Sequence, residues 1–235
     1  VSAGQFQAAL SDPSIAFRLT DQMLSHIARD MRSWLDQGFD VRHVGINLST
    51  ADFNRGDILQ RLADAFEPAG VPLDRIALEV TEGVFMDGQD DKVVRAIEKL
   101  RQKGITVALD DFGTGYASLT HLIRFPVDVI KIDKTFIRDL KHDQTNNKLV
   151  GAIISMGVGL ELPLVAEGIE NDAILGTLRQ MGQLKGQGYH YGRPEPHAKV
   201  LERLAELGLL APDVPFGESA APDFDLSELA SQKIG

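Results

Sequence analysis

Carboxylate side chains gather where a buried strand of this sequence ends. The stretch VALDDF, residues 107–112, runs from three apolar residues into the adjacent carboxylates of Asp110 and Asp111. Two neighbouring carboxylates repel one another, so they need a cation, a raised pKa or exposure to water. Their oxygen atoms suit hard divalent ions such as Mg2+ or Mn2+. A carboxylate that bridges two such ions recurs in two-metal hydrolysis of phosphate esters, and this chemistry is what the pair predicts.

Polar residues follow the other apolar runs in the same manner. They are Asn47, Glu79 with Glu82, Lys131 with Asp133, Glu167 with Glu170, and Gln187. In a parallel α/β barrel the carboxyl ends of the strands meet on one face, where the active sites of that architecture lie. Several carboxylates in one small volume are unstable unless cations lie among them. We therefore expect these side chains to share one site.

The runs that carry these residues are short and apolar, as buried parallel strands are. They cover residues 41–48, 75–80, 105–111, 127–133 and 162–168, with a weaker run at 184–188. Amphipathic stretches at 53–66 and 92–100 predict helices between them. Strands that alternate with helices pair in parallel, and their nearly continuous apolar character indicates that both faces are covered. The sequence thus predicts an α/β fold of the TIM-barrel type.

The composition narrows the class of protein. A chain of 235 residues that is 43% hydrophobic fits one large domain with a full core. Its net charge of −10 argues against polymeric nucleic acid as a partner. The lack of cysteine permits a cytoplasmic location, and no apolar run is long enough to cross a membrane. We expect the barrel at 1–210 and, where proline, alanine and acidic residues become frequent, a tail at 211–235.

The glycine-containing loop after residue 110 resembles two other nucleotide motifs only in part. Asp111-Phe112-Gly113 spells the magnesium motif of protein kinases, but no His-Arg-Asp catalytic loop precedes it, so a kinase is rejected. GTGYAS, residues 113–118, is a broken dinucleotide fingerprint and a weak signal. We expect the glycines to let the backbone bend sharply above a metal site.

Each strand-end residue also has a purely structural interpretation. Asn47 could cap the helix that begins near residue 53, and Glu79 and Glu82 could be solvated charges. Lys131 with Asp133 could form a surface ion pair of little energetic value, and Lys131 could simply bind a neighbouring carboxylate. The agreement of six strand ends favours a common site over these separate explanations.

The motifs NLSTADF, LEVTE, LDDFGTGYASL, VIKIDKTFI, VAEGIE and GQGYHYGRPEP occur in the order and spacing of the EAL-domain cyclic di-GMP phosphodiesterases. The chain resembles that family from its start to about residue 210. The resemblance implies a modified TIM (β/α)8-type barrel that hydrolyses cyclic di-GMP to linear pGpG with two Mg2+ or Mn2+ ions. It also suggests a homodimer.

The resemblance assigns the metal site to particular residues. The residues that match family metal ligands are Asn47, Glu79, Asp110, Asp111 and Glu167. Lys131 resembles the family's partner to the attacking water. A lysine beside two divalent cations would tend toward its neutral form, which suits a base that orients or deprotonates that water.

Other matched residues surround this centre. Glu82 and Glu170 resemble the residues that hold the Asp-Asp-Phe-Gly loop and the neighbouring loop. Gln187 resembles the polar group that closes the site. The loop that lines the guanine pockets in the family corresponds to Arg193, Pro194 and Pro196.

The sequence departs from the family in one respect, because the Glu-Ala-Leu segment that names it does not occur in these residues. In active members its glutamate is a metal ligand on an early strand. Either an opening hairpin precedes residue 1 in the parent protein, or the protein lacks it. Six strands and a two-stranded hairpin make the eight of a closed barrel, which favours the first explanation.

Three functions follow from these expectations. The leading one is a cyclic di-GMP phosphodiesterase. The second is an EAL-like sensor that binds cyclic di-GMP without cutting it, which loss of the early glutamate would produce. The third is a structural partner domain that acts through a dimer face, and the preserved ligand set makes it the weakest.

Overall fold

Six parallel strands form the centre of the computed structural model, and each coincides with one of the apolar runs, although two of them end one residue later than predicted. They are β1 (Val44–Leu48), β2 (Ile76–Thr81), β3 (Thr106–Phe112), β4 (Val129–Ile132), β5 (Leu164–Ala166) and β6 (Lys185–Gly186). All pair in parallel, in chain order, in one sheet. The predicted parallel α/β architecture is confirmed, including its short sixth strand.

The structure describes residues 12–54, 57–85, 90–114, 122, 124–140, 143–206 and 208. The predicted tail at 211–235 and most of the glycine-containing loop at 113–118 lie outside these residues, so the boundary at 210 stays a prediction. In the part of the chain that is described, no helix combines the length and the apolar character that spanning a membrane requires.

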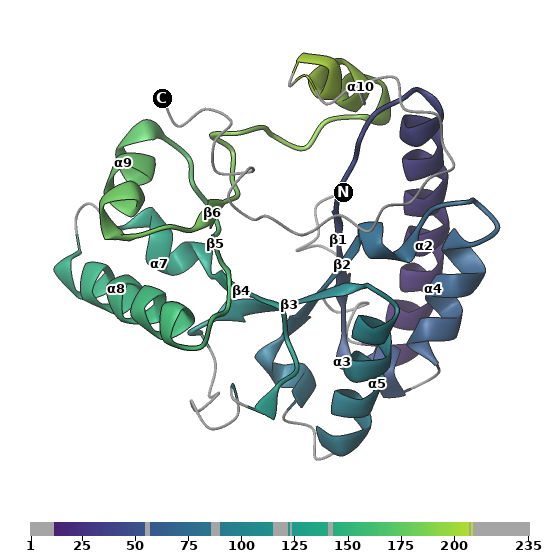
Figure 1. Cartoon of the computed structure of the whole chain (residues 1–235), viewed down its shortest axis with the longest axis horizontal. Coiled ribbons are helices and arrows are strands. Elements are labelled where there is room, and N and C mark those ends of the chain that lie inside the picture. The colour runs from purple at the N-terminus through teal and green to yellow at the C-terminus, as the bar shows by residue number, and fades with distance from the viewer. Residues whose placement is uncertain are drawn as a thin grey trace.

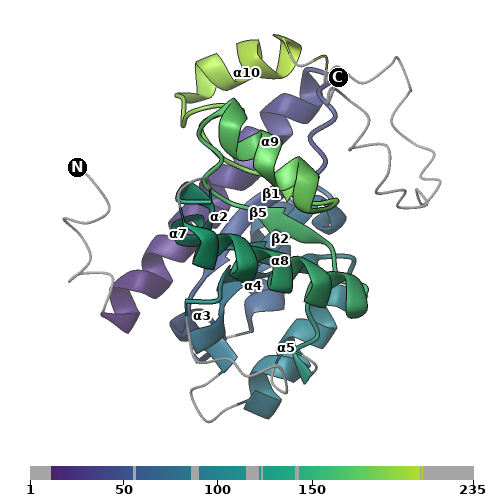
Figure 2. The same ribbon diagram turned by 90° about the vertical axis from the view of Figure 1, so that its left-hand side faces the viewer.

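Helices lie outside the curved sheet, with α2, α4 and α5 beside the first three strands and α8 and α9 beside the last three (Figure 1). The α-helices are α2 (Pro13–Asp36), α3 (Thr50–Asn54), α4 (Ile58–Phe66), α5 (Asp90–Gln102), α7 (Lys134–Arg138), α8 (Gln144–Gly159), α9 (Asp172–Met181) and α10 (His197–Glu206). Two short 3-10 helices, η1 (Leu73–Arg75) and η2 (Glu82–Phe85), flank β2. Figure 2 shows α10 beside the end of α2, where the ring of His197 stacks on Trp34.

The predicted helix at 53–66 is wrong in one detail, because it is two helices. Asp57 caps α4, since its carboxylate accepts hydrogen bonds from the backbone N–H groups of Leu59 and Gln60. An aspartate in this position satisfies backbone donors that a helix start leaves unpaired, so it favours a new helix there.

Burial alternates along β2 and separates two faces of the sheet. Ile76, Leu78 and Val80 are fully buried, whereas Ala77 and Glu79 between them are only partly buried. Successive strand side chains point to opposite faces, so the buried set packs toward the helices and the other set faces the inside of the sheet's curve. This inner face is where the polar strand ends meet.

Candidate active site

Asp110 and Asp111 bring their carboxylates to the same place although they are neighbours on one strand. On a regular strand their side chains would point to opposite faces. The register of β3 against β4 shifts between Leu109 and Phe112, and Asp111 has a φ of 52°. Such an irregularity re-aims a side chain, and aspartate tolerates this left-handed conformation better than most residues. Oxygen atoms of Asp110, Asp111 and Glu167 consequently lie within 4.8 Å of one another.

Lys131 lies at the centre of the carboxylates. Its Nζ atom is 2.8 Å from Oε2 of Glu79, 3.0 Å from Oδ1 of Asp110 and 2.7 Å from Oε1 of Glu167. The lysine comes from β4 and its partners come from β2, β3 and the end of β5, so one ammonium joins four successive strands. Lys131 is only 4% exposed. The interpretation of Lys131 and Asp133 as a surface pair is therefore wrong.

The carboxylates determine the protonation of Lys131. Burial alone would lower its pKa, but the hydrogen bonds to Glu167 and Glu79 and the charges of Glu79 and Asp110 outweigh burial and raise it above the ordinary lysine value. This direction is opposite to the one expected for a lysine beside two divalent cations. Among these carboxylates alone, Lys131 favours its ammonium form, which neutralises its neighbours.

Burial also raises the pKa of Glu167, and the charges of Asp110 and Glu79 add to this effect against the opposing influence of Lys131. One lysine therefore leaves the electrostatic cost of this carboxylate only partly compensated. A further cation in the cluster would favour its charged form.

Asp111 and Asp133 shift each other's pKa in opposite directions. Burial, the charge of Asp110 and a hydrogen bond with Asp133 raise the pKa of Asp111 to about 6. Asp133 keeps a lowered pKa despite its burial, because it accepts hydrogen bonds from the hydroxyl and the backbone N–H of Thr135 at the start of α7. Sequence reasoning named Asp133 as a strand-end residue but gave it no role. Its spacing of two from Lys131 was the available signal, since such residues share a face of a strand.

The residues present fit divalent cations. The cluster brings the carboxylates of Glu79, Asp110, Asp111, Asp133 and Glu167 around the single ammonium of Lys131. Oδ1 of Asp110 is buried and accepts no hydrogen bond within the described part of the chain, although Lys131 lies near it. Crowded oxygen ligands with an excess of negative charge and an unsatisfied buried acceptor suit a hard metal ion.

Glu82 lies beside the loop that leaves β3. It is buried in η2, and its Oε1 accepts a hydrogen bond of 3.2 Å from the backbone N–H of Gly113. Gly113 has a φ of 99°, and a Cβ there would lie 2.9 Å from the ring of Phe136. The loop thus requires glycine for its backbone conformation and for the space beside α7.

The remaining predicted residues have no described contact with the carboxylates of the cluster. Asn47 is exposed at the end of β1 and pairs in register with Glu79. Glu170 is exposed and its Oε1 lies 3.4 Å from Nη2 of Arg138 on α7. The other exposed residues, which belong to the segment from β6 to α10, are Gln187, Arg193, Pro194 and Pro196. Within that segment the guanidinium of Arg193 lies over the ring of Tyr189, 4.7 Å from its centroid.

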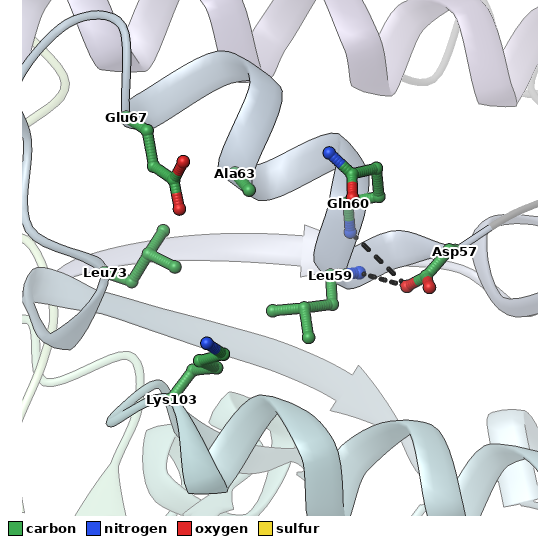
Figure 3. Close-up of a pocket in the computed structure, with 7 residues that line it drawn as sticks. All are labelled: Asp57, Leu59, Gln60, Ala63, Glu67, Leu73 and Lys103. Atoms are coloured by element: carbon green, nitrogen blue, oxygen red, sulfur yellow. Dashed lines mark hydrogen bonds between the residues drawn. The ribbon is translucent and has the colours of Figure 1, made fainter.

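A cavity of about 220 Å³ lies elsewhere, against α4 (Figure 3). Its lining residues are Asp57, Leu59, Gln60, Ala63, Glu67, Leu73 and Lys103. It shares no residue with the carboxylate cluster. We assign the chemistry to the strand ends, because Asp111, Lys131 and Glu167, whose pKa values are perturbed, lie together there.

The comparisons with known proteins agree with this fold. The model of the EAL domain family matches residues 1–194, and the chain belongs to this family. The predicted family membership is thus confirmed.

Two curated relatives come from Pseudomonas aeruginosa. The bifunctional diguanylate cyclase/cyclic di-GMP phosphodiesterase MucR is 34% identical over 205 residues, which are 87% of this chain and 30% of the relative. The cyclic di-GMP phosphodiesterase NbdA is 36% identical over 187 residues, or 80% of this chain and 24% of the relative. The chain therefore spans less than a third of the length of these relatives.

Solved structures extend the likeness to three dimensions. The complex of the PaMucR phosphodiesterase with c-di-GMP has a TM-score of 0.79 and 33% identity, covering 85% of this chain and 81% of that one. A manganese and cyclic di-GMP complex of Klebsiella pneumoniae BlrP1 has a TM-score of 0.72 and 27% identity, covering 82% of this chain and 48% of that one. The fold is a modified (β/α)8 barrel, with six of its strands in the described residues.

Proposed function

We propose that this chain is the phosphodiesterase domain of a bacterial signalling protein and hydrolyses cyclic di-GMP to linear pGpG. The observation that carries the proposal is the convergence of Asp110, Asp111 and Glu167 within 4.8 Å at the ends of β3 and β5, the two strands that flank β4. The names of the relatives, cyclic di-GMP phosphodiesterases among them, support the same substrate. The complexes of similar structures with c-di-GMP support it as well.

Two Mg2+ or Mn2+ ions would be held by the family ligand set, Asn47, Glu79, Asp110, Asp111 and Glu167. When bound, such ions supply positive charge that stabilises a phosphoryl transition state and lowers the pKa of a water molecule. They would also allow a domain with a net charge of −10 to accept an anionic dinucleotide.

The chain's own residues would orient the reaction. Lys131, which lies among three carboxylates, would orient or deprotonate the attacking water. Glu82 would keep the loop after β3 in place through Gly113, and we infer that Glu170 does the same for the neighbouring loop. Gln187 would close the site. The guanine bases would lie against Arg193, Pro194 and Pro196.

Turnover of cyclic di-GMP tests the proposal. The assay would use Mg2+ or Mn2+ on this chain and on the parent protein with the residues upstream of Val1, with separation of pGpG as the readout. Calorimetric titration of cyclic di-GMP in Ca2+ would measure binding separately. Hydrolysis by either protein supports the proposal. Binding without hydrolysis in both would establish the sensor instead, and no binding in either would contradict both functions.

We further infer a homodimer and a cytoplasmic location for the domain, which rest on its family resemblance and its composition. Sedimentation of the purified chain with and without cyclic di-GMP tests the dimer.

A further inference from the structure

The turn that follows Asn47 is fixed by a carboxylate that sequence reasoning did not single out. Asp52, in α3, accepts hydrogen bonds through Oδ2 from the backbone N–H of Ser49 at 2.9 Å and from its hydroxyl at 2.8 Å. The backbone N–H of Asp52 donates in return to the carbonyl of Ser49 at 3.0 Å. The carboxylate of Asp52 thus caps the backbone N–H of Ser49, which is one half of the capping box that the sequence pattern Ser-Thr-Ala-Asp predicts.

The same carboxylate is held from its other side by a partly buried arginine. Oδ1 of Asp52 lies 3.0 Å from Nη1 of Arg61 on α4, and the two side chains are 1% and 12% exposed. Removal of the arginine would leave the buried charge of Asp52 uncompensated. The ion pair therefore connects the turn after β1 to α4, and its disruption would cost substantial free energy.

Arg61 is itself anchored to α2. Its Nε lies 2.8 Å from Oδ1 of Asp21, its Nη2 donates to the carbonyl of Phe17, and its guanidinium lies 3.9 Å from the centroid of the Phe17 ring. Most donors of the planar guanidinium thus have a fixed partner, so the group is held in one orientation. The network connects α2, α4 and the turn at Ser49 in one rigid unit.

Asn47 stands two residues before Ser49 on the last part of β1. It pairs in register with Glu79, whose carboxylate binds Lys131, and its own side chain is exposed on the inner face. Asn47 does not cap α3, because Ser49 and Asp52 form that cap. The side-chain amide of Asn47 is therefore available to the site. The direction in which this amide points depends on how firmly the end of β1 is held.

We propose that the ion pair Asp52–Arg61 is a positioning device for Asn47 and thereby sets the metal affinity of the site. This inference rests on the proposed function, in which Asn47 is a metal ligand. Residues that orient a metal ligand from behind change metal affinity or activity by about 10–100-fold when they are altered.

Calorimetric titration with Mn2+ is the first test, with Asp52→Ala, Asn47→Ala and the double variant compared with the unaltered chain. Asp52→Ala is expected to weaken Mn2+ binding at least about tenfold. In the Asn47→Ala background the same change is expected to have no further effect, because the device acts through Asn47. Unchanged affinity in Asp52→Ala, or an equal loss in both backgrounds, would overturn the proposal.

Asp128→Ala is a matched control at the opposite end of the sheet. Asp128 also accepts from a strand backbone N–H, that of Val107 at 2.8 Å, and from an arginine, Arg101 at 2.8 Å. It lies where β4 begins and not where the strands end. We expect Asp128→Ala to lower the thermal midpoint and leave Mn2+ affinity unchanged. A general loss of stability would weaken Mn2+ binding in both variants and contradict the proposal.

A measurement without metal separates this inference from the proposed function. In 15N-labelled protein with EDTA, Asp52→Ala is expected to shift the side-chain amide signal of Asn47 and to speed hydrogen exchange at Leu48 and Ser49. An unchanged signal and unchanged exchange would overturn the inference even in a chain that binds no Mn2+. If Asp52→Ala does not fold, Arg61→Gln, which keeps the bonds between Asp52 and Ser49 and removes the ion pairs of Arg61 with Asp52 and Asp21, is expected to show the same changes.

Discussion

A Cβ atom at Gly45 would lie 2.5 Å from Oε1 of Glu79, so the missing side chain on β1 makes room for a carboxylate on β2. Gly45 and Asn47 are two residues apart and therefore share the inner face of the strand. Oε2 of the same Glu79 lies 2.8 Å from Lys131. The position of one site carboxylate thus depends on a glycine that carries no chemistry itself.

Gly45→Ala is expected to weaken Mn2+ binding by about tenfold with little change in stability. The new methyl group displaces only the end of the flexible Glu79 side chain, and alanine costs the unfolded chain some conformational entropy, so the thermal midpoint should move by no more than about 2 °C. Calorimetry with Mn2+ and thermal unfolding in EDTA measure the two effects. Gly176→Ala on α9, where an added Cβ meets nothing within 4 Å, is the control and should leave Mn2+ affinity unchanged. If Gly45→Ala bound Mn2+ as tightly as the unaltered chain, the packing of Gly45 against Glu79 would not matter for the site.

Lys131→Met is expected to lower the free energy of unfolding by about 3–5 kcal/mol at pH 8, because it leaves buried carboxylates without their cation. The loss should be smaller at pH 5. Without Lys131 the already raised pKa of Glu167 rises further. A carboxylate with a folded pKa above its unfolded value contributes stability at low pH and loses it as the pH rises. Urea unfolding at both pH values checks this, with the exposed Lys199→Met as the control. A loss independent of pH would mean that packing and not charge is responsible.

Asp111→Asn is expected to stabilise the metal-free protein at pH 8. The pKa of Asp111 is raised to about 6 in the folded state, so its contribution to stability is complete below about pH 4 and is lost as the pH rises through 6. The asparagine cannot ionise and avoids this loss. We expect a rise of the thermal midpoint of about 2–4 °C, which corresponds to about 1 kcal/mol for a group only partly buried. Thermal unfolding in EDTA at pH 8 and pH 4 should show the rise only at pH 8. A rise of the thermal midpoint at pH 4 and not at pH 8 would contradict the raised pKa of Asp111.

The apolar runs and the residues at their ends were sufficient to predict the order of the strands and most of the site. Each strand ends near the residue that the sequence marks, because parallel strands of a barrel must point the same way. Lys131, Glu79, Asp110 and Glu167 meet for this reason alone.

What could not be predicted depends on pairing between strands. The shift in register that turns Asp111 toward Asp110 arises between β3 and β4, and no local pattern records it. The interaction of Asp111 with Asp133 follows from that shift. The role of Gly45 depends in the same way on a neighbouring strand. The capping box of Ser49 and Asp52 was readable, but its link to Arg61 required the packing of α3 on α4.

Asp110→Asn is expected to abolish turnover of cyclic di-GMP. The loss should be well above the roughly 100-fold that follows when a residue that only orients a metal ligand is altered. The substitution keeps the shape of the side chain and removes one negative charge from a site crowded with carboxylates, so Mn2+ binding should weaken while the fold is retained. Turnover would be followed in whichever protein, this chain or its extended parent, is active, and thermal unfolding would be measured alongside. Asp139→Asn, an exposed residue at the end of α7, is the control and should behave as the unaltered protein. Turnover at the parent rate in Asp110→Asn would remove the carboxylate cluster from the mechanism, because the most buried of its metal-binding oxygens would then be dispensable.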